Sequence, residues 1–126
     1  MTINSPASRT VLVVEDEAII RMLLVEVFED SGFEVLEASR ASDALELLSL
    51  RSDIVALFTD VEMPGDMNGY ALARESRQSH PCIAVIVASG REMPKPGDLP
   101  VGGKFVPKPY RPESVVATIC DMVCAA

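Results

Sequence analysis

Residues 10–17, TVLVVEDE, decide the fold of this chain. The stretch joins a continuous apolar run, Thr10 to Val14, to three consecutive acids. Uninterrupted apolar runs of this length are typical of strands that are buried on both faces of a parallel sheet. The run therefore predicts a central strand, and the acids predict a polar edge where that strand ends.

Along the chain from this stretch, strand-like apolar runs alternate with segments whose apolar residues recur at helical spacing. The expected strands are 10–14, 34–38, 54–58, 82–88 and 104–106. The expected helices are about 20–28, 42–49, 70–78 and a last one that opens at 111–113. Gly32 is expected to end the first helix and Ser42 to cap the second. Strands and helices in alternation predict an α/β fold, a doubly wound sheet of five parallel strands joined by right-handed crossovers.

Length and composition restrict the function further. The chain has 126 residues, which is one domain at roughly 150 residues per domain. A net charge of −8 argues against a nucleic-acid-binding domain and against docking on anionic lipid. Apolar runs stay below the roughly 18 residues of a membrane span, and the polar start lacks a signal-peptide core. Three cysteines make no disulfide framework, so a reducing, cytoplasmic location is expected.

Polar side chains follow four of the expected strands. Glu15 and Asp16 follow the first, Asp60 the third, Ser89 the fourth, where Gly90 comes next, and Lys108 the fifth. In doubly wound sheets the ligand lies beyond the carboxyl ends of the strands, so these groups should converge. Three carboxylates brought together suppress one another's ionisation unless a cation neutralises them. Oxygen ligands without clustered His or Cys favour a hard divalent ion, Mg²⁺.

The same set of groups suits phosphoryl transfer. A carboxylate can act as the nucleophile and form an aspartyl phosphate. A metal ion and Lys108 can neutralise the phosphoryl oxygens, and the hydroxyl of Ser89 can donate a hydrogen bond to one of them. Each residue alone is more often a cap, a turn residue or a solvated side chain. Chance alone rarely places five such residues together at the ends of four strands.

Four segments carry a resemblance to the receiver domains of two-component response regulators: VLVVEDE at 11–17, FTDVEMPGDMNG at 58–69, VIVASG at 85–90 and KFVPKPY at 104–110. The resemblance covers about residues 9–124 and implies a flavodoxin-like sheet of order 2-1-3-4-5. It implies that Asp60 accepts the phosphoryl group, and that Mg²⁺ is bound by Asp16 and Asp60, by Glu15 through water, and by the backbone carbonyl of Glu62.

The resemblance also implies roles for the other strand-end residues. Ser89, Gly90 and Lys108 would contact the phosphoryl group, and the Lys108–Pro109 bond is commonly cis in the family. Ser89 and Phe105 would form the switch, with Phe105 working by packing because it lacks the hydroxyl of the more common Tyr. Glu62 is expected to point to solvent and to modulate the access of water to the phosphate.

Two stretches depart from the family pattern. The turn after Asp60, MPGDMNG, is one residue longer than usual, and Asn68 stands where Asp is common. Residues 91–103, REMPKPGDLPVGG, hold three prolines and three glycines and make a poor helix. The family's fourth helix is therefore expected to be short, displaced or absent. The loop in its place and Phe105 are expected to be the moving parts of the switch.

These features predict a phosphorylatable signalling switch rather than an enzyme. The switch is expected to assist its own phosphorylation and dephosphorylation. The expected partners are a histidine kinase or phosphotransfer protein and a downstream protein, with no direct contact to nucleic acid or membrane. A small phosphatase with Glu62 as general acid is the alternative, although no cap would enclose a substrate. A pseudo-receiver is disfavoured by the complete set of acids. Met1 and the absence of a linker after Cys124 favour a stand-alone receiver over a piece of a larger regulator.

Overall fold

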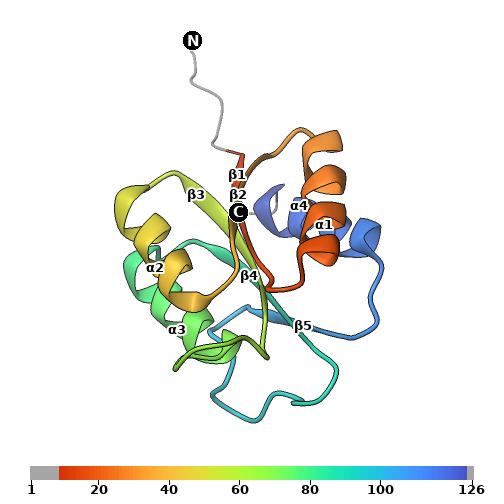
Figure 1. Ribbon diagram of the computed structural model, residues 1–126. Helices are drawn as coiled ribbons and strands as arrows, with labels where there is room; N and C mark the ends of the chain where they lie inside the picture. Colours follow the sequence, from red (N-terminus) through yellow and green to blue (C-terminus); the bar gives the residue numbers. More distant parts are fainter. Residues whose placement is uncertain (1–8, 125–126) are drawn as a thin grey trace.

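The computed structural model describes residues 9–124, in which strands and helices alternate along most of the chain (Figure 1). The element bounds are β1 Thr10–Val14, α1 Ala18–Asp30, β2 Glu34–Ala38, α2 Ala41–Leu50, β3 Ile54–Asp60, α3 Gly69–Ser79, β4 Ala84–Ser89, β5 Lys104–Pro107 and α4 Pro112–Cys124. All strand pairs are parallel and their order is β2-β1-β3-β4-β5. The predicted fold class and strand order are confirmed.

Two helices cover each face of the sheet. Strand β1 shows why, because its side chains alternate between the two cores: Val11 and Val13 pack with α1 and α4, whereas Leu12 and Val14 pack with α2 and α3. All four side chains are fully buried. A strand buried on both faces is apolar at every position, as the sequence of this one is.

Several element boundaries differ from the sequence expectation. Helix α2 begins one residue before Ser42, and Arg40 occupies the N-cap position without a side-chain cap, so the predicted Ser42 cap is wrong. Strand β4 begins only at Ala84, because Pro81 and Cys82 form a turn in which the Ile83 N–H donates to the His80 carbonyl at 3.0 Å. Gly32 does end the first helix, as predicted, at a positive φ of 92°.

Strand β3 runs two residues further than predicted, to Asp60, which pairs with Ala88 of β4. The ladder therefore continues into the acidic residue and holds its backbone as part of the sheet. Asp60 is placed by the sheet itself and not by a loop.

The segment between β4 and β5 contains no helix, so the predicted loss of the family's fourth helix is confirmed. Residues 90–103 form turns and irregular backbone at the lower edge of the molecule in Figure 1. Helix α4 consequently corresponds to the last of the expected helices, and its first residue, Pro112, lies within the predicted opening at 111–113. None of the helices within residues 9–124 is long and apolar enough to span a membrane.

Candidate functional site

Three carboxylates meet where β1 and β3 end. One oxygen each of Glu15, Asp16 and Asp60 lies within 4.8 Å of the others. Glu15 and Asp60 are buried, with 0% and 2% exposure, and Asp16 is exposed at the rim. Glu15 is held by two backbone bonds, since its N–H donates to the Ala38 carbonyl at 3.0 Å and its Oε2 accepts from the Glu17 N–H at 3.0 Å. The predicted convergence of the acids is present in the structure.

Lys108 supplies the positive charge of the cluster. Its Nζ lies 2.9 Å from Asp60 Oδ1 and 4.0 Å from Glu15 Oε1. The backbone fixes this reach, because the Lys108 N–H donates to the Ser89 carbonyl at 3.0 Å just beyond the β4–β5 pairing. The Lys108–Pro109 peptide bond is cis, as the resemblance implied. A Cβ on Gly90 would lie 3.4 Å from the Lys108 Cβ, so a small residue suits that position.

Burial dominates the electrostatics of these groups. Burial raises the pKa of Glu15 to about 7, against the opposing hydrogen bond from Glu17. Burial also raises the pKa of Asp60, although the hydrogen bond and charge of Lys108 act in the other direction. Burial lowers the pKa of Lys108, but the hydrogen bond and charge of Asp60 and the charge of Glu15 outweigh it, so that the pKa is raised on balance. One lysine thus leaves the three acids under-neutralised.

The cluster fits a divalent cation. Glu15 Oε1 is buried and has no hydrogen-bond partner among the described residues. A buried carboxylate oxygen without a hydrogen bond is costly unless an ion or a donor meets it, and Lys108 Nζ stays 4.0 Å away. The donor set is made of oxygens only, which is the chemistry that Mg²⁺ prefers. Glu15, Asp16 and Asp60 are therefore the side chains that could hold such an ion.

The raised pKa of Glu15 predicts how stability depends on pH without divalent metal. Its ordinary value is 4.5 and its folded value about 7, so between these values the folded chain binds a proton that the unfolded chain lacks. The free energy of unfolding should therefore rise by about 2 kcal/mol as the pH falls from about 8 to about 5. Denaturant unfolding in a chelator measures this. The Glu15→Gln chain should lose most of the gain, and a flat or falling profile in the unsubstituted chain would contradict the expectation.

The hydroxyl of Ser89 lies at the end of β4 beside the acids. It donates to Glu62 Oε2 at 2.5 Å and accepts from the N–H groups of Arg91 at 3.0 Å and Glu92 at 2.8 Å. Ser89 is 1% exposed. The expectation that Glu62 points to solvent is wrong, because the buried Ser89 hydroxyl donates a strong hydrogen bond to the Glu62 carboxylate.

The turn after Asp60 is closed by a glycine and capped by an asparagine. The Gly69 N–H donates to the Val61 carbonyl at 3.0 Å, and the Val61 N–H donates to the Ala88 carbonyl at 2.9 Å. Asn68 Oδ1 accepts from the Ala71 N–H at 2.9 Å and caps α3. Asn68 thus acts on the helix, and no hydrogen bond to the acids is found for it among the described residues.

Helix α3 holds the irregular segment 90–103 in place. Tyr70 Oη donates to the Glu92 carbonyl at 2.5 Å, and Arg74 and Arg77 donate to the carbonyls of Asp98 at 3.0 Å and Val101 at 2.5 Å. These three residues are spaced four and three apart, so they share one face of the helix. The face restrains a segment with no helix of its own.

Phe105 lies half-buried on the edge strand β5, where it pairs in register with Val87 of β4. Its position beside the strand that carries Ser89 agrees with the sequence expectation. Its partial exposure leaves room for the ring to change its packing.

Sequence reasoning missed two residues of the site. Arg21 of α1 donates to the Glu15 carbonyl at 2.7 Å and to Glu37 Oε1 at 3.1 Å, and so buttresses the acidic turn. The hydroxyl of Tyr110 is buried without a described hydrogen-bond partner. Burial, followed by the charges of Glu15 and Asp60, raises the pKa of Tyr110. An aromatic residue two positions after Lys108 was the available signal for Tyr110, whereas nothing in the sequence singled out Arg21.

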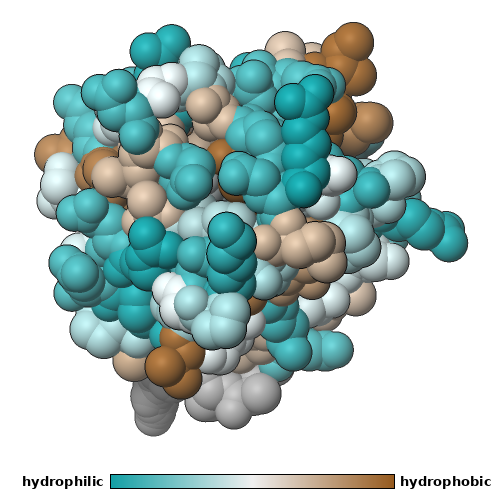
Figure 2. All heavy atoms as spheres, turned by 90° about the horizontal axis from the view of Figure 1, so that it is seen from below, coloured by the Kyte–Doolittle hydropathy of each residue, from teal (hydrophilic) through white to brown (hydrophobic). Residues whose placement is uncertain are grey.

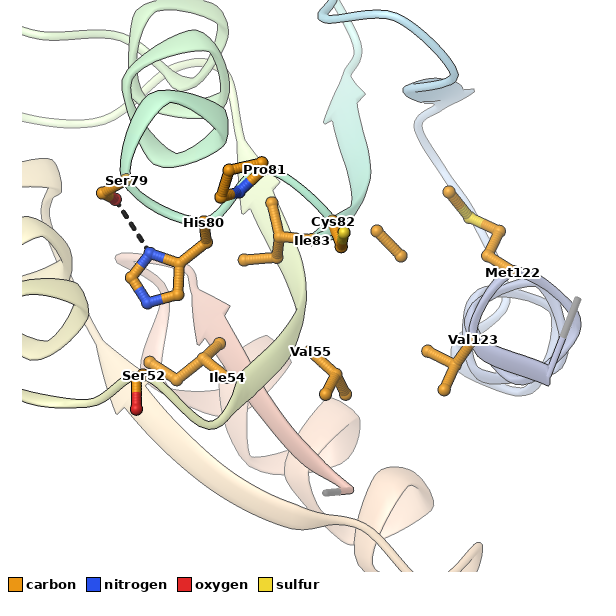
Figure 3. A pocket seen from close by; sticks show the side chains of 11 residues that line it. Ser52, Ile54, Val55, Ser79, His80, Pro81, Cys82, Ile83, Met122 and Val123 are labelled. Carbon is orange, nitrogen blue, oxygen red and sulfur yellow. Dashed lines mark hydrogen bonds between the residues drawn. The ribbon is translucent and has the colours of Figure 1, made fainter. Parts of the chain in front are cut away.

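A separate hollow of about 530 Å³ lies at the opposite edge of the sheet (Figure 3). Its walls come from the start of β3, the turn before β4 and the end of α4, where Met122 and Val123 face it. The His80 ring lies within hydrogen-bond distance of Ser79 Oγ, at 2.8 Å, and of the Arg51 carbonyl, at 2.7 Å. The hollow is mainly apolar and lies far from the acids.

The surface around the acids is uneven. Figure 2 looks onto the carboxyl ends of the strands and shows a mainly hydrophilic face with an apolar cluster at its upper right, over α1. Ile19, Met22 and Leu23 of α1 form this cluster, with exposures of 75%, 66% and 49%. Helix α1 begins two residues after Asp16, so the apolar cluster borders the acidic site. Exposed clusters of this kind mark interaction surfaces.

Comparison with protein families gives a match over most of the chain. The response regulator receiver domain family matches residues 11–119. Solved structures agree with this: the receiver domain from the hybrid histidine kinase CckA is 29% identical, superposes with a TM-score of 0.76, and the match covers 90% of this chain and 98% of that one. A response regulator receiver protein from Sinorhizobium medicae, 22% identical with a TM-score of 0.82 over 94% and 96% of the two chains, shares the fold.

Curated relatives point the same way. The sensor kinase CckA of Brucella abortus is 38% identical over 92% of this chain and 13% of the relative. The aerobic respiration control protein ArcA of Escherichia coli is 33% identical over 83% and 44%. The chain therefore spans less than half the length of these two relatives. The chemotaxis protein CheY of Thermotoga maritima is 34% identical over 88% of this chain and 94% of its own.

Proposed function

Because this chain belongs to the response-regulator receiver family of two-component signal transduction, we propose that it accepts a phosphoryl group on Asp60. The observation that carries this assignment is the geometry around that carboxylate. Asp60 Oδ1 lies 2.9 Å from Lys108 Nζ, and Glu15 and Asp16 stand beside it. Residues 9–124 would be the core of a single receiver domain. We place it in the cytoplasm, since an odd number of cysteines suits a reducing compartment.

Each residue of the site has a separate role in the phosphoryl transfer. An oxygen of Asp60 attacks phosphorus, and the bond from phosphorus to the donor's imidazole nitrogen breaks with the electron pair leaving on that nitrogen. Lys108 neutralises charge on the phosphoryl oxygens, and Ser89 and the backbone at Gly90 offer hydrogen bonds to them. We expect these groups to assist hydrolysis of the acyl phosphate as well. The domain would act as a switch, and a phosphatase acting on other substrates is the less supported function.

We assign the metal to Glu15, Asp16 and Asp60, with the backbone carbonyl of Glu62 as a further ligand. When bound, magnesium would supply positive charge to the phosphoryl oxygens. The side chains present fit this role because they are oxygens that one lysine does not neutralise.

The metal assignment predicts opposite effects of one substitution. Asp16→Asn should weaken Mg²⁺ binding by at least about tenfold, while the metal-free chain gains stability because one of three repelling carboxylates is gone. Calorimetric Mg²⁺ titration and metal-free denaturant unfolding measure the two effects. Asp66→Asn is the control, since Asp66 is exposed on the turn after β3. An unchanged Mg²⁺ affinity in Asp16→Asn would refute the assignment.

We propose that the donor is a histidine kinase or a phosphotransfer protein, and that it docks on the apolar cluster of α1. A protein donor has to bring its phosphorylated imidazole to Asp60, so it must cover the rim of the acidic site. Ile19, Met22 and Leu23 border that rim and offer the apolar contact area that such docking needs. A downstream protein would read the phosphorylated state.

We propose that segment 90–103 and Phe105 are the moving parts of the switch. Ser89 joins the phosphoryl site to the start of the segment, and β5 with Phe105 follows its end. Its ties to the rest of the fold include the three hydrogen bonds from α3, and a segment held by few bonds reorders at low cost.

Hydrogen exchange with and without beryllofluoride and Mg²⁺ tests this movement. Beryllofluoride mimics the phosphoryl group, and amides in 90–103 are expected to change their protection because Ser89 changes its partner. Helix α2 serves as the internal reference, since it packs on β1 and β2, which β3 separates from β4 and β5, and should exchange equally in both states. Equal protection of 90–103 in the two states would contradict the proposal.

A further inference from the structure

The hydroxyl of Ser89 is fully used in this structure. A serine hydroxyl has one proton to donate and two lone pairs to accept. The proton goes to Glu62 Oε2 at 2.5 Å, and the lone pairs accept from the N–H groups of Arg91 and Glu92. Because Ser89 is 1% exposed, water does not supply further partners. Any new acceptor near Ser89 must displace Glu62.

Glu62 is placed to compete for that proton. It follows Asp60 by two residues, on the turn that leaves β3, and its charge acts on both Asp60 and Lys108. Its carboxylate is half-buried, so the bond from Ser89 is a charge-assisted one at an incompletely hydrated site. Among the described residues, Glu62 has no ion pair with Lys or Arg that would hold it elsewhere.

We propose that Glu62 is a positioning residue that holds the Ser89 hydroxyl in the resting state and competes with the phosphoryl group for its proton. The inference rests on the proposed phosphorylation of Asp60. A phosphoryl group on Asp60 carries negative oxygens into the same space, so it both attracts the Ser89 proton and repels the Glu62 carboxylate. Ser89 changes acceptor, and Glu62 moves out toward solvent.

The exchange has a consequence for segment 90–103. Ser89 Oγ accepts the N–H groups of Arg91 and Glu92, and the Glu92 carbonyl accepts from Tyr70. A turn of the Ser89 side chain toward Asp60 therefore strains or breaks the bonds that begin the segment. Glu62 in this way sets both the affinity for the phosphoryl group and the resting position of the segment.

The test is a double-mutant cycle read by beryllofluoride binding in saturating Mg²⁺. Glu62→Ala removes the competitor and should tighten binding by about tenfold, the effect of one hydrogen bond to a charged group. Glu62→Gln keeps an acceptor for Ser89 and should tighten binding less. The control Asp66→Asn removes an exposed charge from the same turn and should change affinity by less than about twofold.

The Ser89→Ala background separates competition from plain charge repulsion. If Glu62 acts through the Ser89 proton, the gain in beryllofluoride affinity on Glu62→Ala should be smaller in the Ser89→Ala background. We expect that gain to be at least about threefold smaller than in the unsubstituted chain. An equal gain with and without the Ser89 hydroxyl would overturn the inference. No binding by the unsubstituted chain would instead contradict the proposed function and remove the inference with it.

A second readout needs no phosphoryl mimic. In the unmodified protein, Glu62→Ala should shift the backbone amide resonances of Arg91 and Glu92. These amides donate to the Ser89 hydroxyl, which would no longer have Glu62 as its acceptor. Asp66→Asn should leave both resonances in place. Unmoved Arg91 and Glu92 amides in Glu62→Ala would show that the bond is not formed in solution and would overturn the inference.

Discussion

The Asp60→Asn chain is expected to take up no phosphoryl group from acetyl phosphate in Mg²⁺, while the unsubstituted chain takes up one. Asparagine keeps the shape of the side chain at the end of β3 but has no anionic oxygen to attack phosphorus. The pairing of Asp60 with Ala88 involves the backbone alone, so the fold should persist. Intact-protein mass spectrometry measures the uptake, and circular dichroism checks the fold.

Asp66→Asn is the matched control for this experiment. Asp66 lies six residues further along the same turn and is exposed, so its removal should leave uptake unchanged. Stoichiometric uptake by Asp60→Asn would show that another residue accepts the phosphoryl group. Loss of uptake in both variants would point to the charge of the turn and not to one nucleophile.

Among substitutions that add one methyl group at the acidic edge of the sheet, Gly69→Ala is expected to be the most destabilising. A Cβ at Gly69 would lie 2.1 Å from the Asp60 carbonyl oxygen and 2.9 Å from the Val61 Cα. Both are backbone atoms of the strand that carries the site, so neither can rotate away. We expect a loss of about 3 kcal/mol or more in the free energy of unfolding, as for other severe overpacking.

Denaturant unfolding of Gly69→Ala beside Gly65→Ala separates steric contact from backbone strain. Gly65 has a φ of 107° but no atom within 4 Å of an added Cβ, so alanine there should cost only about 1 kcal/mol. Gly69→Ala protein that still folds should also bind beryllofluoride weakly, because the clash displaces the backbone of Asp60, whose carboxylate is the proposed phosphoryl acceptor. Equal losses in the two variants would contradict the steric explanation.

Much of the site could be predicted because it follows from where strands end. Glu15, Asp60 and Lys108 each come directly after or shortly after an apolar run, and parallel strands bring such positions to one edge. The cluster of Glu15, Asp16 and Asp60 within 4.8 Å is the outcome of that rule. The absence of a helix over 91–103 could also be predicted from the local sequence, because prolines and glycines disfavour a helix whatever surrounds them.

The orientation of Glu62 was not predictable in the same way. Spacing put it two residues after Asp60 but gave no information on whether a buried donor stood nearby. Ser89 comes from another strand, 27 residues along the chain, and offers that donor at 2.5 Å. The same holds for the His80 ring, which bonds the Arg51 carbonyl at 2.7 Å, 29 residues away.

The sequence by itself determined the order of elements, the sheet's two buried faces and the identity of the groups at its edge, because hydrophobic periodicity and strand ends are local properties. The tertiary structure decided which oxygen accepts which proton and which pKa is raised. It buried Glu15 completely, which raises the pKa of that carboxyl to about 7, and it joined Ser89 to Glu62. Burial and hydrogen bonding across strands depend on residues far apart in the chain, so they exist only once the sheet has assembled.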